Sequence, residues 1–171
     1  MNIVKQPPDR PESSPGHILV AEDDIVSQMV VTRILKEAGY TMDLVVDGLQ
    51  VLSALESRHY DLILMDCMMP RKDGFEATRA VRSSNSTRIN PEIPVIAMTG
   101  LTDELDKQRC LNAGMQRVIC KPFKLQTLIP VIQQCLSEYE NTESTLDNDD
   151  RPTQGICDDG FLDSVIDTFQ Q

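Results

Sequence analysis

The chain has 171 residues, of which 40% are hydrophobic, and a formal net charge of −11 at pH 7. This length predicts one ordinary domain with some additional chain. No apolar run approaches the roughly 18 residues of a membrane span, so we expect no membrane partner. The first residues also lack the apolar stretch of a signal peptide, and we therefore predict a cytoplasmic protein.

The negative charge is concentrated toward the C-terminal end. Residues 138–171 contain ten acidic residues and one arginine, a sum of −9, whereas residues 16–137 sum to −2. Nucleic-acid backbones are bound by clustered lysines and arginines, so this distribution argues against nucleic acid as a direct partner.

The five cysteines show no C-x-x-C spacing and have no histidine close by in the sequence. The sequence therefore indicates neither a zinc site nor a disulfide framework. We expect four of them to be small buried apolar groups, namely Cys67, Cys110, Cys120 and Cys135.

Strand-like and helix-like segments alternate along most of the chain. Residues 1–15 hold four prolines and few apolar side chains, and they are predicted to form a disordered leader. Short apolar runs predict strands, and helical spacing and cap residues predict helices. The predicted strands are residues 18–21, 41–45, 62–65, 95–98 and 117–120.

Five helices are predicted between and after these strands. The first has apolar residues at helical spacing, at Val26, Met29, Val30, Ile34 and Ala38, and ends at Gly39. The others are a segment around residues 51–55, residues 74–83 with a polar loop after them, a helix from Thr102 or Asp103 to Gly114, and residues 125–139. Pro130 should bend the last helix. Five such β-α units predict an α/β fold in which a parallel sheet is covered by helices on both faces.

Polar side chains follow four of the predicted strands. Glu22 and Asp23 follow the first, Asp66 the third, Thr99 the fourth and Lys121 the fifth. Open α/β sheets bind ligands at the carboxyl ends of their strands. Two carboxylates about 5 Å apart repel by roughly 3 kcal/mol at an effective dielectric near 20, so three in one pocket require a cation. Oxygen ligands of this kind suit Mg²⁺.

Four motifs in this order resemble the response-regulator receiver domains of two-component systems. They are Leu-Val-Ala-Glu-Asp-Asp at 19–24, Met-Asp-Cys-Met-Met-Pro at 65–70 with Asp-Gly at 73–74, Val-Ile-Ala-Met-Thr-Gly at 95–100, and Cys-Lys-Pro-Phe at 120–123. The stretch 65–74 is especially similar to receivers of hybrid histidine kinases. The resemblance covers residues 16–137 and implies a flavodoxin-like (βα)5 doubly wound parallel sheet with strand order 2-1-3-4-5.

The resemblance also implies a function, which is phosphoryl acceptance in a two-component phosphorelay. Asp66 would be the phosphoacceptor, Thr99 and Lys121 would bind the phosphoryl group, and the Lys121–Pro122 peptide bond would be cis. The phosphoryl donor would be a sensor or hybrid histidine kinase or a histidine phosphotransfer protein. The protein would signal to an unknown downstream protein and catalyse only its own phosphorylation and dephosphorylation.

The same resemblance assigns the ligands of Mg²⁺. Asp23 and Asp66 would bind the ion directly, Glu22 through water, and Met68 through its backbone carbonyl. Gly100 would leave space beside the phosphoryl group. Each of these residue types has an ordinary structural use in isolation, as a turn former, a helix cap or a solvated loop. Only their combination predicts the site.

The chain departs from the receiver pattern in the fifth strand. Many receivers have a tyrosine or phenylalanine three residues before the lysine, and this position is Val118 here. The conformational response to phosphorylation could therefore be small. Met68 and Leu101 are apolar where the family controls water access, so we expect slow autodephosphorylation.

Residues 138–171 are predicted to be an acidic linker with a short amphipathic helix near the end of the chain. The apolar stripe of this helix consists of Phe161, Leu162, Val165, Ile166 and Phe169. It fits docking on the domain, binding to a partner, the first helix of a histidine phosphotransfer domain, or a frayed terminus, and the sequence leaves these alternatives open.

Two other functions compete with phosphoryl acceptance. A pseudo-receiver would bind partners without phosphorylation; the acidic residues, Asp66, Thr99 and Lys121 argue against it, whereas Val118 keeps it open. A flavin-binding protein of the same architecture needs a glycine- and hydroxyl-rich phosphate loop after the first strand. Acidic residues stand at that place and would repel the flavin phosphate.

Overall fold

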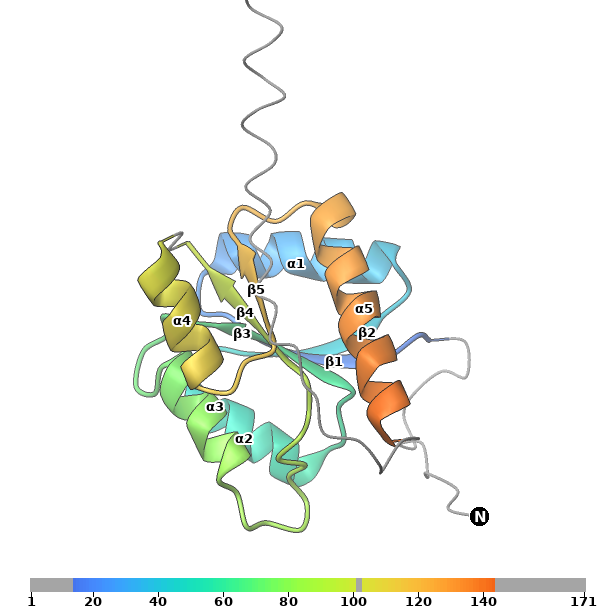
Figure 1. Cartoon of the computed structure of the whole chain (residues 1–171). Coiled ribbons are helices and arrows are strands. Elements are labelled where there is room, and N and C mark those ends of the chain that lie inside the picture. The colour runs from blue at the N-terminus through green and yellow to red at the C-terminus, as the bar shows by residue number, and fades with distance from the viewer. Residues whose placement is uncertain (1–13, 101–102, 144–171) are drawn as a thin grey trace, which may run out of the picture.

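The computed structural model describes residues 14–100 and 103–143, and these form five strands and five helices in strict alternation (Figure 1). The strands are β1 (His17–Ala21), β2 (Thr41–Val45), β3 (Leu62–Asp66), β4 (Val95–Thr99) and β5 (Arg117–Cys120). The helices are α1 (Ile25–Glu37), α2 (Gly48–Ser57), α3 (Gly74–Arg82), α4 (Glu104–Asn112) and α5 (Leu125–Glu143). No helix of the described residues is long and apolar enough to cross a membrane.

The five strands form one parallel sheet in the order β2-β1-β3-β4-β5. This confirms the predicted fold class and strand order. Helices α1 and α5 lie on one side of the sheet, and α2, α3 and α4 lie on the other (Figure 1). The sheet order makes β1, β3, β4 and β5 consecutive neighbours. Their carboxyl ends therefore lie side by side at one edge.

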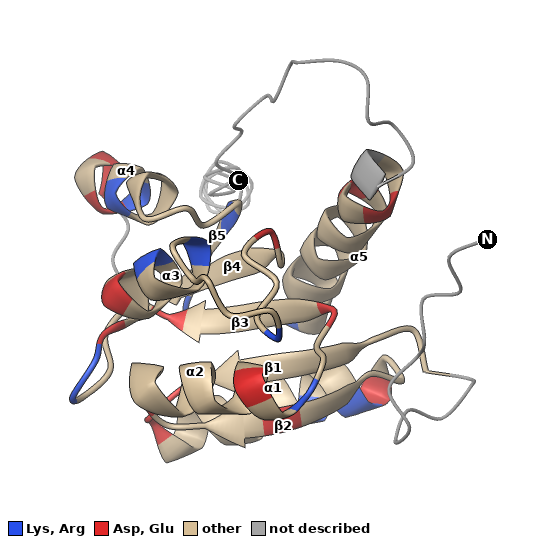
Figure 2. Ribbon diagram, turned by 90° about the horizontal axis from the view of Figure 1, so that it is seen from below, with Lys and Arg blue, Asp and Glu red and all other residues tan. Residues whose placement is uncertain are grey.

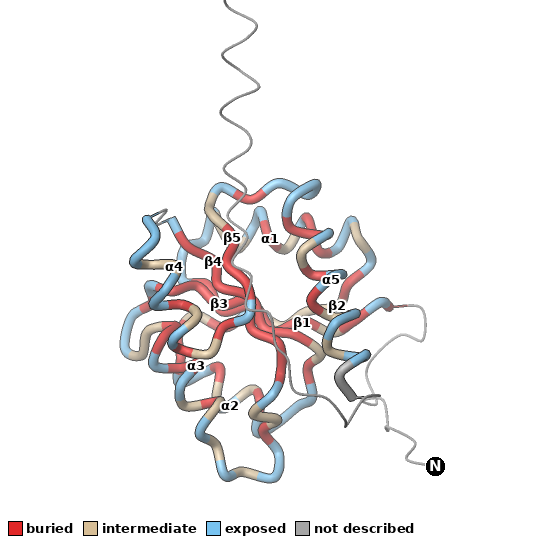
Figure 3. Tube along the Cα trace, in the orientation of Figure 1, coloured by how far each residue is buried: buried red, intermediate tan, exposed pale blue. Residues whose placement is uncertain are grey.

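The sheet is buried on both faces, as its continuous apolar strands require. Alternate residues of each strand point to opposite faces, so Ile18 and Val20 pack under α1 and α5, whereas Leu19 and Ala21 pack under α2 to α4. Figure 3 shows β1, β3, β4 and β5 buried along nearly their whole length, whereas the edge strand β2 is only partly buried. Exposed positions lie on the outer sides of the helices. This double core holds the strand ends in fixed positions.

Each of the first four helices begins after an aspartate that caps it. The carboxylates of Asp24, Asp47, Asp73 and Asp103 each accept a hydrogen bond from the backbone N–H three residues later. Such caps contribute about 1 kcal/mol each. Four aspartates of the strand-to-helix loops are therefore occupied in forming the helices.

Helix α1 buries a different face from the one that its sequence pattern indicates. Among the apolar residues at helical spacing, Ile34 is buried, but Val26, Met29 and Val30 are exposed. Val31, Ile34 and Leu35 form the buried face instead. The apolar residues of α1 outnumber those that the sheet can cover, and an apolar surface remains at the start of the helix.

Helix α5 runs to Glu143, four residues beyond its predicted end, and contains Pro130. The predicted boundary between domain and linker, after residue 137, thus falls inside this helix. Ser14, within the predicted leader, is buried and donates its hydroxyl to the carbonyl of Gly16. The predicted C-terminal stripe lies outside the described residues. Of the four cysteines expected to be buried, Cys120 is only partly buried because it lies at the end of the edge strand β5.

Candidate functional site

The functional residues predicted from the sequence lie at the carboxyl ends of four neighbouring strands. Glu22 and Asp23 follow β1, Asp66 ends β3, Thr99 ends β4 and Lys121 follows β5. In Figure 2 the arrows of β1 and β3 point to the same edge, and the ribbon of β3 ends in an acidic residue. The backbone N–H of Lys121 donates to the Thr99 carbonyl at 2.7 Å, which ties the ends of β4 and β5 together.

Three carboxylates converge at this edge. One oxygen each of Glu22, Asp23 and Asp66 lies within 4.8 Å of the others. Glu22 is fully buried and Asp66 is 5% exposed, whereas Asp23 is exposed. A group of anions that is buried on one side and open to solvent on the other has the oxygen donors that Mg²⁺ prefers. The residues present therefore fit a hard divalent cation.

The ammonium group of Lys121 lies between two of these carboxylates. Its Nζ is 2.7 Å from Glu22 Oε2 and 3.0 Å from Asp66 Oδ2. Burial opposes the charge, but the hydrogen bonds to Glu22 and Asp66 outweigh it and raise the pKa of Lys121. The lysine is thus protonated at neutral pH and offsets part of the carboxylate charge. The Lys121–Pro122 peptide bond is cis, as the resemblance implies.

Glu22 carries the largest electrostatic penalty at the site. Burial raises its pKa to about 6 from the usual 4.5; the hydrogen bond from Lys121 opposes this rise, and the charge of Asp66 adds to it. The backbone N–H of Asp24 donates to Glu22 Oε1 at 3.1 Å, and the Gln28 amide donates to the Glu22 carbonyl at 2.6 Å. The start of α1 therefore holds this glutamate in place.

The loop after β3 folds back over Asp66. The backbone N–H of Met68 donates to Asp66 Oδ1 at 3.1 Å, while the Met68 side chain is exposed. The Gly74 N–H donates to the carbonyl of Cys67, and a Cβ atom at Gly74 would overlap the backbone carbonyl oxygen of Asp66. The Asp-Gly motif of the sequence therefore has a steric cause that the sequence pattern alone does not reveal.

The remaining predicted residues lie close to this group. Thr99 is buried at the end of β4, the strand between those that carry Asp66 and Lys121. A Cβ atom at Gly100 would meet no atom within 4 Å, so there is open space beside the strand end. Val118 is buried in the core under α2 to α4. Leu101 lies outside the described residues.

Two features of the site region were missed by sequence reasoning. One is the contact between the thiols of Cys67 and Cys110, whose sulfur atoms are 3.5 Å apart. The other is the exposed apolar start of α1, described above. No local pattern signals either feature, because the first joins residues 43 positions apart and the second depends on which helix face the sheet covers.

Comparison with known proteins matches the greater part of the chain. The family model of the response regulator receiver domain matches residues 18–133. Hybrid signal transduction histidine kinase K of Dictyostelium discoideum is 35% identical over 127 residues, covering 72% of this chain and 10% of that protein. Transcription factor SKN7 of Saccharomyces cerevisiae is 39% identical over 122 residues, covering 71% and 19%. The chain thus spans at most a fifth of either relative.

A solved structure also resembles this chain. It is the receiver domain of the sensor histidine kinase PA1611 from Pseudomonas aeruginosa PAO1, with a magnesium ion coordinated in its active site cleft. The TM-score is 0.65 at 38% identity, with coverage of 71% of this chain and 98% of that chain.

The buried charge of Glu22 generates a prediction about stability and pH. The pKa of Glu22 is higher in the folded protein, about 6, than its ordinary 4.5, so the ionised form destabilises the fold above pH 6 and the penalty disappears below pH 4.5. In EDTA at pH 8, Glu22→Gln should raise the free energy of unfolding by about 1–2 kcal/mol. Urea unfolding at several pH values measures the difference in the free energy of unfolding between the variant and wild type. This difference should fall to zero between pH 6 and 4.5. A variant less stable than wild type at pH 8 would contradict the account.

The close approach of Gly74 to Asp66 generates a second prediction. Gly74→Ala should lower the free energy of unfolding by at least about 2 kcal/mol, because the new methyl group overlaps backbone that cannot move aside cheaply. Gly100→Ala is the matched control, since it places the same methyl group in open space at the same sheet edge. Equal free energies of unfolding for the two variants would show that the loop over Asp66 is not tightly packed.

Proposed function

Because the chain belongs to the response regulator receiver family, we propose that Asp66 accepts a phosphoryl group from a histidine kinase or a histidine phosphotransfer protein. The observation that carries this proposal is the Lys121 ammonium held between the carboxylates of Asp66 and Glu22. The Lys121 ammonium and the Met68 N–H both donate to the Asp66 carboxylate, and donors of this kind also bind phosphate oxygens. The chain is a receiver domain of two-component phosphorelay systems, and the phosphoacceptor role of Asp66 is the specific proposal.

The side chains divide the work of phosphoryl transfer among them. A carboxylate oxygen of Asp66 attacks phosphorus, the bond from phosphorus to the donor's imidazole nitrogen breaks, and the electron pair leaves with the imidazole. The Lys121 ammonium then pairs with one oxygen of the transferred phosphoryl group, and the Thr99 hydroxyl donates a hydrogen bond to a second oxygen. The Met68 N–H, which donates to Asp66 Oδ1, orients the attacking carboxylate. Positioning and charge stabilisation supply most of the catalysis in such transfers.

Glu22, Asp23 and Asp66, with the backbone carbonyl of Met68, would hold Mg²⁺. The bound ion would neutralise charge on the transferring oxygens. Three carboxylates and one ammonium leave an excess of negative charge at this edge, which supports a cation site. The relative with magnesium in its cleft supports the choice of ion. The apolar Met68 side chain is exposed, and slow autodephosphorylation stays a prediction.

The apolar start of α1 supports protein docking beside Asp66. Ile25, Val26 and Met29 are about 70% exposed, and they directly follow the acidic loop and the Asp24 cap. Exposed apolar patches of this kind mark protein-binding sites. We infer that the phosphoryl donor protein covers this surface when it presents its phosphohistidine to the sheet edge. The downstream partner, the absence of nucleic-acid binding and the cytoplasmic location stay predictions.

A phosphorylation-independent pseudo-receiver is the second candidate. Val118 is buried where many receivers have an aromatic side chain that moves in response to phosphorylation. Binding measurements alone do not separate the two functions, because a receiver and a pseudo-receiver both bind partners. Direct detection of the phosphoryl group separates them.

Intact mass measurement tests the phosphoacceptor. After treatment with acetyl phosphate and Mg²⁺, the wild-type chain should gain about 80 Da, the mass of one phosphoryl group. Asp66→Asn should gain nothing. Asp73→Asn is the matched control, because Asp73 lies in the same loop and Asn retains its helix-capping role. This variant should be phosphorylated like wild type. An adduct of the same mass on Asp66→Asn would refute Asp66 as the phosphoacceptor. Absence of the adduct from wild type would favour the pseudo-receiver.

A further inference from the structure

Two buried thiols face each other immediately behind the phosphoacceptor. Cys67 directly follows Asp66, and Cys110 lies on the inner face of α4. Their sulfur atoms are 3.5 Å apart, and both side chains are at most 1% exposed. The phosphoryl-transfer chemistry proposed above uses neither of them. Closing this contact to the roughly 2.0 Å of a disulfide requires a shift of only about 1.5 Å.

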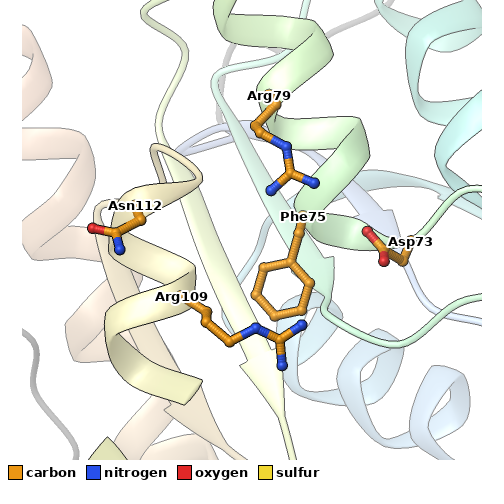
Figure 4. Close-up of a pocket in the computed structure, with 5 residues that line it drawn as sticks. All are labelled: Asp73, Phe75, Arg79, Arg109 and Asn112. Carbon is orange, nitrogen blue, oxygen red and sulfur yellow. The ribbon is translucent and has the colours of Figure 1, made fainter. Parts of the chain in front are cut away.

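Helix α4 is held to the domain by few buried atoms. Of its nine residues, Cys110 is the only one that is buried. A hollow of about 170 Å³ lies between α3 and α4, lined by Asp73, Phe75, Arg79, Arg109 and Asn112 (Figure 4). The Arg109 guanidinium spans this gap, 4.6 Å from the centre of the Phe75 ring. Segments with so little buried apolar surface open locally at low free-energy cost.

We propose that Cys67 and Cys110 form an oxidation site, at which a peroxide converts the two thiols to a disulfide that fastens α4 to β3. Local opening of α4 brings the Cys110 sulfur to solvent, while Cys67 stays in place directly after the buried strand β3. This order explains how buried thiols can react with a small oxidant.

The reaction balances with hydrogen peroxide as oxidant. The Cys110 sulfur attacks one peroxide oxygen and the O–O bond breaks. The departing hydroxide takes up the thiol proton and leaves as water, which gives a sulfenic acid. The Cys67 sulfur then attacks the Cys110 sulfur, the S–O bond breaks, and the hydroxide leaves as water with the Cys67 proton. Two thiols are oxidised, one peroxide is reduced, and two waters form. A reducing thiol restores the original pair.

The disulfide would act on the part of the fold that follows the phosphoryl site. The chain leads from Thr99 at the site to Asp103, which caps α4. A covalent bond from α4 to the residue after Asp66 restricts displacement of the helix relative to the sheet edge. The bond forms whether or not Asp66 accepts a phosphoryl group, so the two proposals can fail separately.

Peptide mass mapping tests the site on the full 171-residue chain. The folded protein is treated with a small excess of hydrogen peroxide, free thiols are blocked under denaturing conditions, and the chain is digested without reductant. We expect a peptide pair joined through Cys67 and Cys110, absent from Cys67→Ser, Cys67→Ala and Cys110→Ser. Cys135→Ser is the matched control, because Cys135 is a buried cysteine on the opposite face of the sheet, and its cross-link yield should equal that of wild type.

Hydrogen exchange supplies a second readout that does not involve phosphorylation. Amide exchange in α4 should slow at least tenfold on oxidation and recover with reductant, while exchange in α5 should stay unchanged. Two outcomes would overturn the proposal. One is a folded protein in which Cys67 and Cys110 stay reduced after the partly exposed Cys120 is fully oxidised, and the other is a cross-link that leaves α4 exchange unaltered.

Discussion

The charge balance between one ammonium group and three carboxylates governs the candidate site of this domain. Lys121 contacts Glu22 and Asp66, and the two contacts of 2.7 and 3.0 Å leave a net negative charge in a largely buried place. Like charges this close are held together only because the fold places them there. The pKa of Glu22 is raised, chiefly by burial, which shows that the ionised carboxylate costs the folded state free energy. A bound cation, or a proton on one carboxylate, reduces this repulsion.

The fold supplies that free energy through its double core. The order β2-β1-β3-β4-β5 makes neighbours of the four strands that carry the candidate site, and apolar side chains on both faces fix their ends. Asp24 caps α1 three residues after the end of β1, so the loop that carries Glu22 and Asp23 is short and these acidic residues have little freedom. Helix α4 is the exception, because it buries a single side chain, and that side chain touches the residue after Asp66. The distribution of apolar residues thus holds the strand ends firmly and leaves α4, beside them, weakly packed.

The sequence predicts the strands, the helix order and the residues that meet, because these follow from local patterns. Apolar runs determine strands, and a parallel sheet brings their carboxyl ends to one edge regardless of detail. Facts that depend on tertiary contact are not predictable in this way. The exposure of Val26 and Met29 depends on which face of α1 the sheet covers, and the Cys67–Cys110 contact depends on where α4 packs against the sheet. Gly74 shows an intermediate case, since its motif is visible in the sequence but its cause, the carbonyl of Asp66, is not.

Calorimetric titration with Mg²⁺ tests the charge balance at the site most directly. Wild type should bind one ion, and Asp23→Asn or Asp66→Asn should weaken binding at least tenfold by removing a negative ligand. Lys121→Ala should bind the ion about tenfold more tightly or better, because it removes a positive charge that competes for the same carboxylates. Unchanged affinity in the two aspartate variants, or weaker binding by Lys121→Ala, would contradict the account.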